Sequence, residues 1–327
     1  MTDETEFQTP RVALGAGVIA VAMAFLFLHT FGGRVLVELG NEIVGTDEAW
    51  RYRGLSTLVV LGGLLGAVGA AMRFRLEVWQ TNLGWSLRAG SLAAVFGAMV
   101  DGWSGLLGAA FAMGVGAGWI LTALATGMRA SIGTRRLGIV IGGGLALSVL
   151  LGEFALFMAS LFGDPTKGAA IVIAMLLAAT SVVVPFLTPL EPSMDMESGY
   201  RGKGLVLNWI LMAAVLGAGS ALQGSAAAVA GHLSIITAGV IIPLLVGRWL
   251  DADHRRYALV TGVAILTVGA VLGNSAGIGS LMPLMATAWI TTVAFHFAAR
   301  GGRVWVAAGT VGLVLFVAPF AASQLAG

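Results

Sequence analysis

The amino-acid sequence predicts an all-α polytopic membrane protein. Of its 327 residues, 58% are hydrophobic and only 10% are charged, and the mean hydropathy is +0.93. Soluble domains carry about a quarter charged residues. Apolar runs of roughly 20 residues, the length that a helix needs to cross the hydrocarbon core, recur from one end of the chain to the other. We therefore expect about 11 transmembrane helices.

Short polar or glycine-containing breaks separate these runs. The third and fourth runs are divided only by Asp101, Gly102 and Trp103, whereas the longest break, about 32–53, is expected to form an external loop with a short surface helix. The 48 glycines, against 8 prolines, fit helices that pack closely through small residues. The predicted runs are 11–31, 54–72, 85–103, 104–127, 136–163, 168–190, 204–224, 226–249, 257–274, 277–299 and 304–325.

The most polar break inside the membrane region is residues 191–203, which follows the sixth run. We interpret it as a cytoplasmic linker between two bundles, 1–190 with six helices and 204–327 with five. If the N-terminus is cytoplasmic, 14 of the 18 Lys and Arg residues fall on inner segments. Because cytoplasmic loops are enriched in basic residues, we predict a multi-pass protein of the cell membrane with its N-terminus cytoplasmic and its C-terminus outside.

The break between the eighth and ninth runs contains a patterned cluster of charge. Gly247 and Asp251 share one face of a helix end, and Arg255 and Arg256 begin the next run. This pattern resembles the cytoplasmic loop signature of the major facilitator superfamily of transporters, which joins the second and third helices of each six-helix half. The resemblance implies a cytoplasmic latch formed by Gly247, Asp251, Arg255 and Arg256.

A second stretch is also similar to that family. Residues 133–152 place a basic segment before a glycine-rich helix, as in the family's fifth helix, which packs across the two halves. The layout of six helices, a linker and five helices is close to the family's six-plus-six plan. A first-half copy of the loop signature, expected near Arg73 to Arg88, and a twelfth helix are not found. The resemblance implies a facilitator-like fold of two bundles.

Four residues are candidates for proton coupling or substrate binding. Glu153 lies well inside an apolar run, where a carboxyl group is costly and is a functional hypothesis by default. Such a group can take up and release a proton, although it can also serve only as a hydrogen-bonding group between helices. Asn208, Gln223 and His232 are polar residues of the second half that could contact a hydrophilic solute, or could stabilise helix packing.

The residues favour transport over catalysis. No cysteine is present, and the chain lacks the metalloprotease, serine-hydrolase and phosphate-binding motifs, so we expect no enzyme activity, no metal and no cofactor. The basic residues are spread over short loops, which predicts no nucleic-acid partner but contact with membrane lipid and a small-molecule or ion substrate. The favoured function is a secondary active transporter working by alternating access. The alternative is a non-transporting membrane subunit, either a quinol-binding anchor of a respiratory oxidoreductase or an assembly scaffold.

Overall fold

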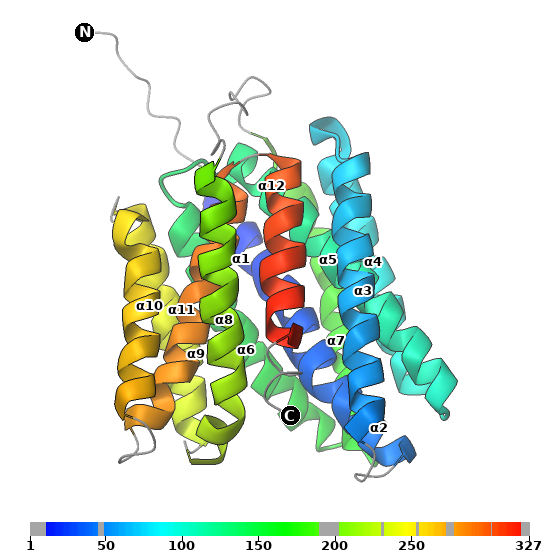
Figure 1. Cartoon of the computed structure of the whole chain (residues 1–327). Helices are drawn as coiled ribbons and strands as arrows, with labels where there is room; N and C mark the ends of the chain where they lie inside the picture. Colours follow the sequence, from blue (N-terminus) through cyan, green and yellow to red (C-terminus); the bar gives the residue numbers. More distant parts are fainter. Residues whose placement is uncertain are drawn as a thin grey trace, which may run out of the picture.

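The computed structural model describes residues 11–44, 49–189, 203–229, 232–252, 255–272, 278–301 and 303–321, and every regular element in these ranges is a helix (Figure 1). The first segment of the chain contributes α1 (Arg11–Phe25), η1 (Leu26–Val35), α2 (Leu36–Val44), α3 (Ala49–Arg73), η2 (Leu76–Val78), α4 (Trp79–Met99), α5 (Trp103–Ile132), α6 (Leu137–Ala159), α7 (Pro165–Val183) and η3 (Val184–Phe186). The second contributes α8 (Lys203–Val229), α9 (His232–Asp251), α10 (Arg255–Leu272), α11 (Ile278–Gly301), α12 (Val304–Gly309) and η4 (Thr310–Val317).

The long helices coincide with the predicted apolar runs, and the all-α membrane fold class is confirmed. The third and fourth runs are separate helices, α4 and α5. By length and hydropathy, eight helices within the described ranges could cross a membrane, whereas α4, α9 and α10 fall short of that combined criterion. The count of eleven crossings stays a prediction. The predicted linker falls almost wholly outside the described residues, so we refer to residues 11–189 and 203–321 as the N-terminal and C-terminal segments.

The predicted external loop at 32–53 is wrong for residues 32–44. Here α1, η1 and α2 form one uninterrupted helical rod, and η1 has π-helical geometry. The helix continues because its apolar face continues, since Phe31, Val35, Leu36 and Leu39 are all buried. Glycines and charged residues in this stretch favour a loop locally, but burial of the apolar face outweighs that local preference.

The predicted start of the third run, residue 85, is also wrong, because α4 begins at Trp79. Polar residues between positions 79 and 85 interrupt the apolar pattern of the sequence. Even so, Trp79, Leu83 and Leu87 are buried and belong to one face of the helix. Arg88 lies within α4, as it does in the predicted run, and its guanidinium lies 4.9 Å from the ring centroid of Trp85.

Two helix pairs approach closely enough that their backbones touch through glycine. Between α3 and α5, a Cβ added to Gly66 would lie 2.1 Å from the carbonyl oxygen of Val115, and one added to Gly118 would lie 2.1 Å from that of Gly63. Only glycine permits this separation. Much of the glycine excess in the sequence is therefore accounted for by interhelical packing.

The second pair, α6 and α9, joins the N-terminal and C-terminal segments. A Cβ on Gly138 would lie 2.3 Å from the carbonyl oxygen of Gly247, and the reverse distance is also 2.3 Å. Further along, a Cβ on Gly142 would lie 2.1 Å from the carbonyl oxygen of Pro243. The segments also meet between α3 and η4, where Gly63 lies against the ring of Phe316.

The bundle has two chemically different ends. At one end, which we call the basic end, the described side chains include nine arginines and two acids: Arg11, Arg73, Arg75, Arg129, Arg135, Arg136, Arg248, Arg300, Arg303, Glu77 and Asp251. At the other, which we call the acidic end, they include five acids and three basic residues: Glu38, Glu42, Asp101, Glu153, Asp164, Arg34, Arg53 and Lys167.

The α6–α9 contact predicts opposite effects for two adjacent glycines. Gly142→Ala should force the helices apart and destabilise the protein by about 1–3 kcal/mol, as overpacked interfaces do. Gly143→Ala is the matched control, since its Cβ would meet nothing closer than 3.6 Å, and alanine raises helix propensity by about 1 kcal/mol. Thermal unfolding of the two variants in detergent measures the difference. Equal melting temperatures would contradict the packing described here.

Candidate functional site

A cavity of about 320 Å³ lies between the N-terminal and C-terminal segments. Its walls come from η1 and α6 on one side and from α9 and α11 on the other. The cavity occupies the half of these helices nearer the acidic end. Its lining residues are His29, Thr30, Arg34, Leu145, Ser148, Val149, Gly152, Glu153, Leu156, Ala238, Gly239, Pro243, Leu284, Thr287, Ala288 and Thr291.

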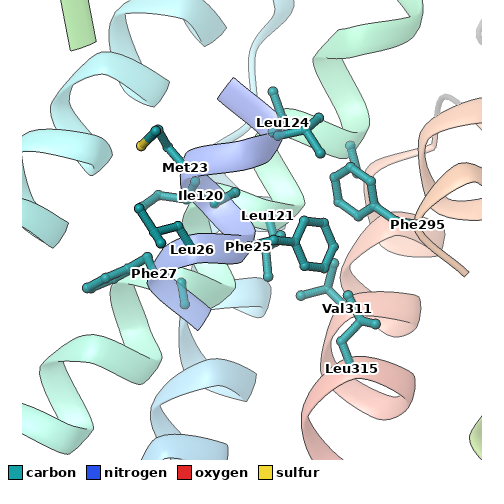
Figure 2. Close-up of a cluster of buried hydrophobic side chains, with 14 of the residues drawn as sticks. Met23, Phe25, Leu26, Phe27, Ile120, Leu121, Leu124, Phe295, Val311 and Leu315 are labelled. Carbon is teal, nitrogen blue, oxygen red and sulfur yellow. The ribbon is translucent and has the colours of Figure 1, made fainter. Parts of the chain in front are cut away.

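A cluster of apolar side chains, which we call the plug, lies next to the cavity, since the ring centroid of Phe25 lies 5.6 Å from that of the lining residue His29. Figure 2 shows the side chains of this cluster. Phe25 and Phe295, one from each segment, meet edge to face with their ring centroids 5.1 Å apart. Leu121, Val311 and Leu315 are grouped around them. These side chains are almost completely buried, and along α1 and α11 the two phenylalanines lie between the cavity lining and the basic end.

One ion pair projects into the cavity. Arg34 Nη1 lies 3.5 Å from Glu153 Oε1, and Arg34 Nε lies 3.6 Å from Glu38 Oε1. The Arg34 and Glu153 side chains are 49% and 32% exposed. Ion pairs this open to solvent contribute only about 0–1 kcal/mol. Either carboxylate can therefore exchange its partner at little cost.

The π-helical geometry of η1 places His29 and Arg34 on the same wall of the cavity. In a π-helix the backbone hydrogen bond joins residues i and i+5, which brings such residues onto one face. His29 and Arg34 have this spacing, and both line the cavity. With ordinary α-helical periodicity, residues five apart would point in clearly different directions. The π-helical stretch thus adds His29 to the face that carries Arg34 and Thr30, two residues whose spacing of four would put them on one face of an α-helix as well.

The basic end is closed by a contact between Asp251 and the start of α6. The Asp251 carboxylate accepts hydrogen bonds from the backbone N–H groups of Gly138, at 2.7 Å, and Ile139, at 2.8 Å. These N–H groups have no partner within their own helix, and the helix dipole favours a negative charge at this position. Asp251 belongs to the C-terminal segment and α6 to the N-terminal segment, so the contact fastens the two together.

A second polar contact joins the two segments at the same end. The guanidinium of Arg129, in the last turn of α5, donates to the backbone carbonyl of Arg300, in the last turn of α11, at 3.2 Å. A cation at a helix C-terminus satisfies a carbonyl group that would otherwise lack a partner. The basic end is therefore held by polar caps as well as by the plug.

Comparison with solved structures identifies the architecture. The human organic anion transporter MFSD10 (TETRAN) is similar with a TM-score of 0.63 at 15% identity, over 98% of this chain and 95% of that one. The major facilitator transporter FucP, in its outward conformation, is similar with a TM-score of 0.62 at 11% identity, over 97% of this chain and 100% of that one. The chain has the major facilitator fold. No protein-family model and no curated protein matches it by sequence.

The predicted facilitator-like fold is thus confirmed, while the predicted site residues are distributed unevenly. Glu153 lies in the cavity wall, but beside Arg34 and not in wholly apolar surroundings. Asn208, on α8, is half-buried and does not line the cavity. Gln223 and His232 lie in helices at positions whose side chains are outside the described part of the structure.

Of the four predicted latch residues, the structure describes the side-chain positions of two. Gly247 and Asp251 both contact α6, and so reach across from one segment to the other. Arg255 and Arg256 begin α10, but their side chains fall outside the described positions, so their part in the latch stays a prediction.

Sequence reasoning missed Arg34, which it placed in a loop, and left His29 aside. It also passed over Thr287 and Thr291, which are four residues apart on α11 and so share a face. The four-residue spacing of these two threonines in the sequence could have indicated a polar face on this helix.

Removing the Asp251 carboxylate should loosen the basic end. Asp251→Ala removes two hydrogen bonds made by a charged group, and a loss of about 2 kcal/mol shifts the ratio of closed to open states by roughly 30-fold. The natural chain has no cysteine, so a single thiol introduced in the cavity by Thr287→Cys can report access. A membrane-impermeant maleimide added on the side of the basic end should then label this cavity thiol faster in the Asp251→Ala background.

Asp164→Ala provides the matched control. Asp164 also caps a helix, accepting from the N–H of Lys167 at 3.0 Å, but this contact lies within the N-terminal segment. The substitution should leave the labelling rate unchanged. If both variants label the cavity thiol equally, Asp251 acts only as a helix cap and does not close the basic end.

Proposed function

We propose that the chain is a secondary active transporter that moves a small solute across the cell membrane by alternating access. The observation that carries this proposal is the cavity between the two segments, which is separated from the basic end by the plug and the Asp251 contact. The similarity to major facilitator transporters supports it. The alternative of a quinol-binding anchor or an assembly scaffold is not favoured, since no observation on the described residues supports it.

In the proposed cycle, the solute enters from the acidic end and binds in the cavity. The plug then opens as Phe25 and Phe295 separate, and the Asp251 carboxylate leaves the start of α6. All these contacts join one segment to the other, so a rocking motion of one segment against the other breaks them together. The excess of arginine at the basic end supports a cytoplasmic location for that end. The solute would then move between the outside and the cytoplasm.

Glu153 is the proposed proton-coupling group. Protonation would neutralise its carboxylate and release Arg34, which would then pair with Glu38 alone. The titratable and charged lining groups that face Glu153 are His29 and Arg34 from η1. The lining residues of α9 and α11 contribute no titratable side chain. A proton bound at Glu153 thus changes the charge of the cavity wall directly.

This role predicts a pH dependence that one substitution removes. The ratio of the labelling rates from the two sides, measured on the cavity thiol of Thr287→Cys, should change with pH in the otherwise unaltered protein, since protonation of Glu153 shifts the balance of states. The ratio is used because the thiolate, which reacts with the maleimide, itself becomes more abundant as pH rises. Glu153→Gln should make this ratio independent of pH. Glu38→Gln, which removes the other carboxylate near Arg34 but lies outside the cavity lining, should retain most of the dependence.

Two outcomes would count against the proposal. If the cavity thiol is labelled from the acidic end only, under every condition, the cavity does not alternate and transport by this route fails. If labelling alternates but Glu153→Gln keeps the parental pH profile, the transporter is not proton-coupled through Glu153.

A further inference from the structure

We infer that the cavity takes a small organic cation with a single positive charge, and that Glu153 binds it in place of Arg34. This inference rests on the proposed function, because it names the class of solute for the same cavity. It depends on three observations, namely the charge around the entrance, the geometry of the Arg34 ion pairs and the composition of the walls.

The first observation is the negative charge at the entrance. The described side chains of the acidic end hold five carboxylates and three basic groups, and together these described groups carry a net charge of −2. Two of the basic groups are already paired with acids there, since Arg34 lies beside Glu38 and Lys167 Nζ lies 2.9 Å from Asp101 Oδ1. An entrance of one sign raises the local concentration of ions of the opposite sign. Cations are therefore attracted to this end, and anions are repelled.

The second observation is that Glu153 can be reached by a competing cation. Its pair with Arg34 is 3.5 Å long and 32% of its side chain is exposed. Charge-assisted N–H···O bonds normally measure about 2.7–2.9 Å, so a solute ammonium can form a shorter bond to Glu153 than Arg34 does. Arg34 need not be left without a partner, because Glu38 lies 3.6 Å from its Nε.

The third observation distinguishes an organic cation from a metal ion. Within the described residues, no group of three or more His, Asp or Glu side chains could hold a metal, and hard cations require many oxygen ligands. The lining instead contains apolar or small side chains, as at Leu145, Leu284 and Ala288, beside the hydroxyl groups of the Ser and Thr residues. Such walls suit a hydrocarbon body. The volume of about 320 Å³ limits the solute to a small molecule.

Binding of a size-matched series tests the inference. The probes are cyclohexylammonium, cyclohexanol and cyclohexanecarboxylate, which share one ring and differ in charge. The readout is the melting temperature of the purified full chain, because a ligand that binds the folded state stabilises it according to its concentration and affinity. Only cyclohexylammonium should raise the melting temperature, and Glu153→Gln should weaken its apparent affinity at least tenfold.

Two further variants separate a binding role from a structural one. Arg34→Gln removes the competing guanidinium and should strengthen cyclohexylammonium binding. If the ion pair between Arg34 and Glu153 were merely structural, its loss would not strengthen this binding. Asp101→Asn removes one negative charge from the same end, at a side chain that is 85% exposed and outside the cavity. It should leave the affinity within about twofold of the parental value.

The inference is overturned if the carboxylate or the alcohol stabilises the protein as much as the ammonium, or if none of the three does. It is also overturned if Arg34→Gln weakens ammonium binding. These measurements involve no movement across a membrane. A transporter with a different solute would still show alternate labelling of the cavity thiol from both sides, and so failure here is distinguishable from failure of the proposed function.

Discussion

The backbone contact between α6 and α9 is the constraint on which the closed basic end depends. Gly138, Gly142 and Gly247 bring the two helices together so closely that a methyl group at any of them would meet main-chain atoms. Only at this separation can the Asp251 carboxylate reach the first N–H groups of α6. The glycines set the distance between α6 and α9, and at this distance Asp251 caps the N-terminus of α6. Close packing and electrostatics thus act at the same point.

The opposite half of the same helices has a different character. Towards the acidic end, α6 and α9 both line the cavity. Glu153, Arg34 and several hydroxyl groups also line it. Polar groups at this depth are expensive unless they have partners or face water. Here they form a loose ion pair and line a cavity. Between α6 and α9, close backbone packing towards the basic end thus gives way to a polar cavity towards the acidic end.

The sequence predicted the fold better than the site. Apolar runs located the long helices, and the spacing of Gly247, Asp251 and the following arginines indicated a facilitator-like plan, because these signals depend on local composition. Arg34 was missed because residues 32–53 were predicted as an external loop, whereas burial of an apolar face continues the helix through residues 32–44. The partner of Asp251 was also out of reach, since α6 lies more than a hundred residues earlier in the chain. Glu153 was identified because an acidic residue inside an apolar run can be recognised from the sequence alone.

Alternation between the two ends is the central claim, and distances across each end test it most directly. Spin labels can be attached to cysteines introduced in place of Arg136 and Arg248 for the basic end, and in place of Ser160 and Val271 for the acidic end, all of which are exposed and lie on different segments. Pulsed electron paramagnetic resonance then gives the distance distribution of each pair. Alternating access predicts two populations at each end, with the distance across the basic end lengthening under the same conditions that shorten the distance across the acidic end. A single unchanging distance at both ends, or distances that lengthen together, would contradict it.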